Sequence, residues 1–148
     1  MKKIVLLIIV TCLFLSSAQG QNLIDFLKID TVELYHYSII IKHPVNFYKK
    51  ETSLEYGGRS ISYASQLPIS FISIIEAANT EMDFGKNCVI TDKTEMEHHY
   101  TEKGVCALKG YYRSDYYKGT RIIISYESVP ECELSLFDNI LDSVIIKR

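Results

Sequence analysis

The sequence predicts a single α+β domain with a largely antiparallel β-sheet and a C-terminal helix that packs on it. Several segments between residues 33 and 128 alternate apolar and polar side chains with a period of two, as half-buried strands do. Only the last segment, after about residue 130, repeats its apolar residues with a helical period. Glycine and proline are few, which argues against a disordered chain.

The first 20 residues are expected to be a cleavable secretory signal. Lys2 and Lys3 precede the apolar run Ile4–Leu15, and small residues at 18 and 20 lead to a cleavage site after Gly20. The alternative is a membrane anchor, but a span needs about 20 apolar residues and this run is shorter. We therefore expect an exported protein, periplasmic or secreted. Residues 21–148 then form one globular domain without a transmembrane span.

The charge balance and the motifs exclude several classes of function. The chain has 16 basic and 18 acidic residues, and loss of the leader removes two lysines. This mildly acidic balance argues against nucleic acid as a partner, because phosphates require a basic patch. The sequence contains no phosphate loop, no Gly-x-Ser-x-Gly and no Cys-x-x-Cys. No cofactor is expected.

The N-terminal half of the mature chain is expected to begin with a helical turn at residues 22–28 and to continue as strands. The first strand ends at His43-Pro44, because proline cannot donate to a strand ladder. Gly57-Gly58 predicts a hairpin turn, and Ile61 and Tyr63 share a face of its second arm. The expected strands are residues 33–42, 46–56, 59–65 and 70–78. The last is apolar on both faces, which is typical of a central strand.

The C-terminal half is expected to contain a polar loop, a short strand, a hairpin and the final helix. The loop covers residues 79–87, the strand residues 88–91, and the polar segment 94–103 is expected to be a surface helix or a long loop. The hairpin arms are residues 105–113 and 120–128, joined by turn residues 114–119. Ser128-Val129-Pro130-Glu131 has capping-box spacing, which predicts the start of the helix. Its apolar face carries Leu134, Phe137, Leu141 and Val144.

Two phrases resemble a known family. Tyr37-Ser38-Ile39 followed by His43-Pro44-Val45-Asn46-Phe47 resembles the opening strand of PsbP/Mog1-like domains. Phe137-Asp138-Asn139-Ile140-Leu141-Asp142-Ser143-Val144 resembles their closing helix. The resemblance implies an α/β/α sandwich around an antiparallel sheet, and a small exported, mostly non-enzymatic binding, assembly or envelope protein. It carries over no site residue.

The mature chain contains three cysteines, Cys88, Cys106 and Cys132. In an oxidising compartment one pair is expected to form a disulfide and one cysteine to be left over. Three pairings are open, and we favour Cys88 with Cys106 because they lie on neighbouring extended segments. Cys132 falls in the first turn of the expected helix, where a thiol can be reactive. We favour a buried, inert thiol instead.

Two clusters are candidates for a functional site. Tyrosine and arginine are enriched at protein interfaces, so a binding surface is predicted at Tyr111, Tyr112, Arg113, Tyr116 and Tyr117. Because neighbouring residues of a strand face opposite sides, about half of this group is expected to pack inward.

The other cluster is the candidate metal site Glu95, His98 and His99. On a helix, Glu95 and His99 would share a face and could chelate a metal. Further ligands, such as His36, His43 or a cysteine, are not indicated by the spacing. The alternative is a solvated polar face.

Two hypotheses of function follow from these clusters. The first is a small exported, non-enzymatic protein that binds a protein or envelope component, for which an inhibitor or immunity protein is one specific form. The second is a small secreted hydrolase or metal-binding enzyme that uses the Glu95–His99 region. The partner itself is not indicated by the sequence.

Export should remove residues 1–20. Mass spectrometry of the exported protein should therefore find a chain that starts at or near Gln21, because the charged, apolar and small-residue segments follow the order of a cleavable signal. An exported chain that still carries Met1 would contradict this prediction.

Overall fold

The computed structural model describes residues 26–54, 58–65, 70–76, 88–107 and 110–148. The expected signal and the expected loop at residues 79–87 lie outside these ranges. The described strands form two sheets, and all strand pairs are antiparallel. The small sheet has the order β1 (Leu27–Glu33), β2 (Ser38–Pro44), β10 (Ile145–Lys147). The large sheet has the order β3 (Tyr48–Ser53), β4 (Arg59–Ala64), β5 (Phe71–Glu76), β9 (Ile122–Val129), β8 (Gly110–Tyr117), β7 (His99–Cys106), β6 (Cys88–Glu95).

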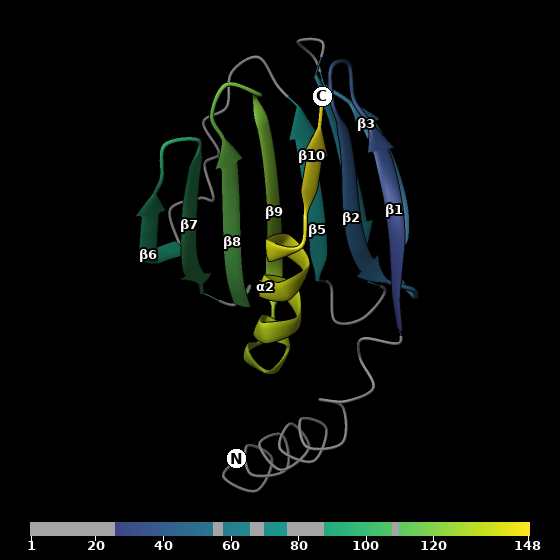
Figure 1. Cartoon of the computed structure of the whole chain (residues 1–148). Coiled ribbons are helices and arrows are strands. Elements are labelled where there is room, and N and C mark those ends of the chain that lie inside the picture. Colours follow the sequence, from purple (N-terminus) through teal and green to yellow (C-terminus); the bar gives the residue numbers. More distant parts are fainter. Residues whose placement is uncertain (1–25, 55–57, 66–69, 77–87, 108–109) are drawn as a thin grey trace, which may run out of the picture.

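The small sheet and the helix α2 (Leu134–Asp142) lie on the same face of the large sheet (Figure 1). The α+β class, the largely antiparallel sheet and the C-terminal packing helix are therefore confirmed. The α/β/α sandwich implied by the resemblance is not the arrangement of the described residues. Their second layer is built from three strands and one helix, and they place no helix on the opposite face.

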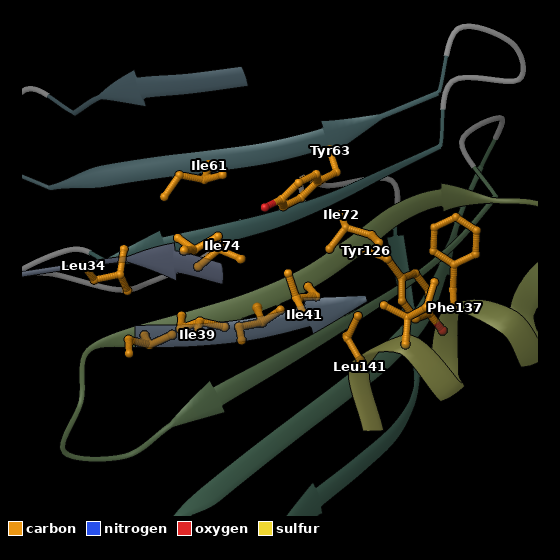
Figure 2. Close-up of a cluster of buried hydrophobic side chains, with 14 of the residues drawn as sticks. Leu34, Ile39, Ile41, Ile61, Tyr63, Ile72, Ile74, Tyr126, Phe137 and Leu141 are labelled. Carbon is orange, nitrogen blue, oxygen red and sulfur yellow. The ribbon is translucent and has the colours of Figure 1, made fainter. Parts of the chain in front are cut away.

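The core between the layers consists mainly of isoleucine. β-branched side chains suit a strand because they pack well on a pleated surface. Figure 2 shows these side chains meeting between the layers. The buried set comprises Val32, Leu34, Ile39, Ile41, Ile61, Tyr63, Ile72, Ile74, Ile122, Ile124, Tyr126, Val129, Phe137, Ile140 and Leu141.

A polar contact closes the core where β1 meets β4. The Tyr63 hydroxyl donates to Asp30 Oδ2 at 2.7 Å, and Lys49 Nζ lies 3.3 Å from the same oxygen. Burial alone would raise the pKa of Asp30, but the hydrogen bonds from Tyr63 and Lys49 leave it below its ordinary value. The buried His43 ring stacks on Tyr63 at 4.4 Å between centroids. The small sheet is thus joined to β3 and β4 by polar as well as apolar contacts.

Several predictions about the N-terminal half are confirmed. β3 and β4 form the hairpin expected around Gly57-Gly58, and Ile61 and Tyr63 both face the core. β5 lies between β4 and β9, as a strand that is apolar on both faces should.

Of the helical turn expected at residues 22–28, Phe26 has 3-10 helical backbone. The prediction is wrong for Leu27 and Lys28, which belong to β1 and pair with Pro44 and His43. The next strand begins at Ser38 instead of residue 33. Leu34 N donates to Tyr37 O at 2.8 Å and turns the chain before that point.

The polar segment 94–103 is neither helix nor loop, so that prediction is wrong. It contains the end of β6, a tight turn and the start of β7, and Met96 N donates to His99 O at 2.7 Å across the turn. Polar residues form strands here because they pair across the hairpin, as Lys93 and Glu102 do at 3.2 Å between Nζ and Oε2.

The boundaries of the last hairpin and of the helix also differ from the prediction. β8 continues through residues 114–117, and the turn is residues 118–121, with φ of 81° at Gly119 and 60° at Arg121. The predicted capping box is not formed, because Ser128 still belongs to β9. Pro130 leads into a short 3-10 turn, η2 (Glu131–Glu133), and no side chain caps it. α2 ends at Asp142 because the next residues form β10, whose Ile146 pairs with Ile39 of β2.

Replacing Phe137 by alanine should lower the free energy of unfolding by about 3–5 kcal/mol, because its side chain is 1 % exposed and fills the space between α2 and the sheet. Its ring meets Tyr126 edge-on at 5.6 Å between centroids. Urea denaturation measures the change. Ser135→Ala at an exposed position of the same helix serves as control, and a loss below about 1 kcal/mol for Phe137→Ala would contradict the packing described.

Candidate interaction surfaces

Arg113 of β8 is the centre of a buried ion cluster beneath α2. Its Nε lies 3.0 Å from Asp115 Oδ1, and its Nη2 lies 2.8 Å from Asp115 Oδ2. That second oxygen has no hydrogen-bond partner among the described residues and is contacted through the ion pair with Arg113. The guanidinium also reaches α2, through Nη1 to Asp138 Oδ1 at 3.2 Å and Nη2 to Asp142 Oδ1 at 2.7 Å.

Asp138 receives further donors from the sheet. Lys103 Nζ of β7 lies 2.9 Å from its Oδ2, and the Tyr126 hydroxyl of β9 donates to its Oδ1 at 3.0 Å. Burial alone would raise the pKa of Asp138, but the hydrogen bonds from Lys103 and Arg113 outweigh it and leave the pKa below its ordinary value. The cluster fastens the helix to three strands. Arg113 was predicted to be part of a binding surface, but its side chain is buried and holds α2 to the sheet.

The predicted metal residues are separated by the hairpin. Glu95 lies opposite Tyr100, so Glu95 and His99 point to opposite faces of the sheet. Lys118 Nζ binds Glu95 Oε1 at 2.6 Å. His98 lies exposed in the turn, 3.6 Å from Glu97. The helical spacing that suggested chelation is thus absent. Within the described ranges no group of three His, Cys, Asp or Glu side chains is placed to hold a metal ion.

His99 contacts residues of β8 and not the other predicted metal ligands. Its ring stacks on Tyr117 at 4.8 Å between centroids, and its Nε2 lies 3.6 Å from Asp115 Oδ1. Thr101 donates to that oxygen at 2.8 Å. His99 is therefore a neighbour of the Arg113 cluster, and the sequence contained no sign of this position because it depends on the β7–β8 register.

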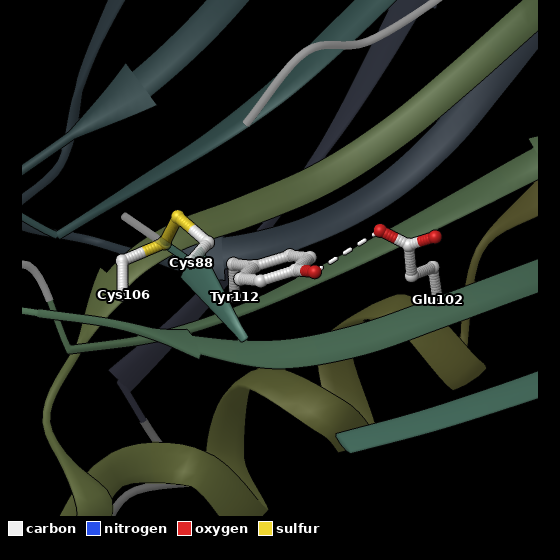
Figure 3. Close-up of a disulfide and its surroundings, with 4 residues drawn as sticks. All are labelled: Cys88, Glu102, Cys106 and Tyr112. Atoms are coloured by element: carbon white, nitrogen blue, oxygen red, sulfur yellow. Dashed lines mark hydrogen bonds between the residues drawn. A yellow bond between two sulfur atoms is a disulfide. The ribbon is translucent and has the colours of Figure 1, made fainter. Parts of the chain in front are cut away.

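The tyrosines divide between the two faces of β8. Tyr112 and Arg113 are buried, whereas Tyr111, Tyr116 and Tyr117 are half-buried. The Tyr112 ring lies against Gly104, where a Cβ would stand 2.5 Å from Tyr112 Cε1, so only glycine fits beneath it. The Tyr112 hydroxyl donates to Glu102 Oε1 at 3.0 Å (Figure 3). Burial, followed by this hydrogen bond, raises the pKa of Tyr112 to about 12.

The disulfide joins Cys88 at the start of β6 to Cys106 at the end of β7, which confirms the favoured pairing. The two residues are directly opposite in the register. A structural disulfide of this kind indicates an oxidising compartment. Cys132 is exposed on η2, so the expectation that its thiol is buried is wrong.

The hairpin of β6 and β7, residues 88–106, is here called the wing. β6 is an edge strand of the large sheet, and every residue of β6 after Cys88 is exposed. Val89 and Ile90 are 64 % and 45 % exposed, and Met96 in the turn is 61 % exposed. A helix or loop at residues 94–103, as predicted, would not have formed this exposed edge strand. The β-branched residues Val89, Ile90, Thr91 and Thr94 were the signal that could have indicated a longer strand here.

No family model, no curated protein and no solved structure matches the chain. In the part of the chain that the structure describes, no helix has the length and apolar character that crossing a membrane would require.

Acid should destabilise the protein partly through Asp138. Because the pKa of this carboxyl is lower in the folded than in the unfolded chain, its contribution is complete above the unfolded value of about 4. The contribution is lost as the pH falls further. Asp138→Asn should therefore flatten the fall in melting temperature below about pH 4. Asp30 and Glu102, whose pKa values are also lowered, account for part of the remaining fall.

Glu97→Gln, which changes an exposed carboxylate in the wing turn, is the matched control and should keep the wild-type pH dependence. Identical acid profiles for wild type and Asp138→Asn would show that the Arg113 cluster does not contribute in this way.

Proposed function

We propose that the protein is an exported, non-enzymatic binding protein that contacts a partner protein through the wing. The observation that carries the proposal is the exposure of β6 on both of its faces. Val89 and Ile90 lie in water at an edge strand, where unpaired backbone groups are also available to another chain. Exposed apolar residues gathered on one element are characteristic of interaction sites.

The way the wing is stabilised supports the proposal. A hairpin that buries few of its own side chains gains little from burial, and the described contacts compensate with the Cys88–Cys106 disulfide and the Lys93–Glu102 and Lys118–Glu95 ion pairs. The wing is therefore held in one conformation before it meets a partner. Such preorganisation lowers the entropic cost of binding.

The chemistry of the wing indicates the kind of partner. The acidic side chains of Asp92 and Glu97 lie near the apolar residues and are exposed, whereas Glu95 is paired with Lys118. A complementary surface would combine an apolar centre with basic residues. The proposed contact surface is the hairpin next to the tyrosine doublets and not the doublets themselves, because Tyr112 and Arg113 are buried.

Export is part of the proposal. It rests on the expected signal and on the disulfide, which is typical of oxidising compartments. The enzyme alternative gains no support from the arrangement of its residues, because Glu95 and His99 point to opposite faces.

Site-specific crosslinking tests the proposal. A photo-crosslinking amino acid at position 90 of the protein, expressed and exported in its native cells, should yield an adduct of one discrete mass. The same amino acid at Thr52 of β3, the opposite edge strand of the large sheet, is the matched control and should yield none.

A second variant shows whether the apolar residues are responsible. Val89→Ser should reduce the adduct formed from position 90, and its free energy of unfolding should stay within about 0.5 kcal/mol of wild type because Val89 is exposed. Equal adducts at positions 90 and 52, or no adduct at either, would refute the proposed role of the wing.

A further inference from the structure

The outer face of the small sheet carries three isoleucines among polar residues, and nothing in the described structure covers it. Ile39, Ile41 and Ile146 face the core, and the alternation of the strands places Ile40 and Ile145 on the opposite side. An antiparallel strand with one solvated face normally carries polar residues on that side. β10 and the middle of β2 therefore carry isoleucine on both faces of the small sheet.

The apolar residues of this outer face are contiguous. Ile145 lies opposite Ile40, which lies opposite Thr31, and Ile29 follows on the same side of β1. Ile29 is 63 % exposed and Ile145 is 51 % exposed, while Ile40 is half-buried. We call Ile29, Ile40 and Ile145 the isoleucine face.

Two lysines flank the isoleucine face. Lys42 is directly opposite Ile29, and Lys147 follows Ile145 on the same side of β10. Neither forms an ion pair with any residue in the described ranges, whereas Lys49, Lys93, Lys103 and Lys118 all do. The carboxylate on this side, Glu33, accepts a hydrogen bond from Ser38 at 3.1 Å. Glu33 offsets part of the charge of the two lysines, so the face presents apolar side chains with a small net positive charge.

We infer that the isoleucine face docks onto the surface of a membrane that contains anionic phospholipid. Isoleucine side chains can enter the boundary between headgroups and acyl chains. The flexible lysine side chains keep their ammonium groups at the phosphates. Charge complementarity selects the anionic surface over a neutral one. The inference is independent of the wing, which carries acidic side chains. The wing lies at the edge of the large sheet opposite to β3 (Figure 1).

Vesicle flotation tests this inference. The exported protein is mixed with vesicles of phosphatidylcholine and phosphatidylglycerol, or of phosphatidylcholine alone. It should float with the first and not with the second. Binding should be lost near 1 M salt, where the Debye length falls to about 3 Å.

Matched variants assign the binding to this face. Each lysine near an anionic surface contributes about fivefold in affinity, so Lys42→Gln with Lys147→Gln should weaken binding roughly 25-fold. Lys50→Gln removes an exposed lysine of β3 on the side away from the core and should leave binding unchanged. Ile29→Thr with Ile145→Thr should abolish flotation while keeping strand-compatible side chains.

Three results would overturn the inference. They are equal binding to neutral vesicles, binding insensitive to the Lys42 and Lys147 substitutions, and a dimer in sedimentation that dissociates on Ile145→Thr. The last would identify a second copy of the chain as the occupant. The wing variant Val89→Ser should float like the wild type, so this test and the crosslinking test can fail separately.

Discussion

The contact between Arg113 and the carboxylates of Asp115, Asp138 and Asp142 is the interaction on which the rest of the structure depends. It fixes α2 against β8, and this places Phe137 over the core and directs the chain into β10. Burial alone would lower the pKa of Arg113, but its carboxylates, Asp115 foremost, raise it, so the charge persists inside the protein. Removing one partner from such a cluster leaves an uncompensated buried charge and costs about 3–5 kcal/mol.

Much of the fold was predictable because isoleucine recurs with a period of two. Ile61 with Tyr63, Ile72 with Ile74, and Ile122 with Ile124 each define the inner face of a strand. The prediction was wrong where this signal was absent. Thr94–Lys103 has polar residues on both faces, so only cross-strand partners reveal that it is a hairpin. The helix was extended too far because Val144 continues the spacing of Leu134, Phe137 and Leu141, although pairing with β2 ends the helix at Asp142.

The candidate sites were predictable only in part, for a related reason. The Cys88–Cys106 pairing follows from two neighbouring extended segments, and the structure confirms it. For the tyrosines, alternation predicts that half of them pack inward. The members that do so depend on where α2 and Gly104 lie, which no local pattern specifies. The contacts of His99 with Tyr117 and Asp115 likewise depend on the register between β7 and β8. Residues paired over long sequence distances are the part that sequence reasoning does not reach.

The strand order of the large sheet has a consequence for how the chain folds. β3, β4 and β5 are a local meander, and so are β6, β7, β8 and β9. The two meanders meet only where β5 pairs with β9, and there Ser73 contacts Ser125, 52 residues away. Loop closure makes such a distant pairing slow relative to the local hairpins. During synthesis the first meander is made before β9, the strand with which it pairs. The isoleucines of β4 and β5 then lack their partner strand until β9 is available, and unpaired apolar strands of this kind are prone to aggregation.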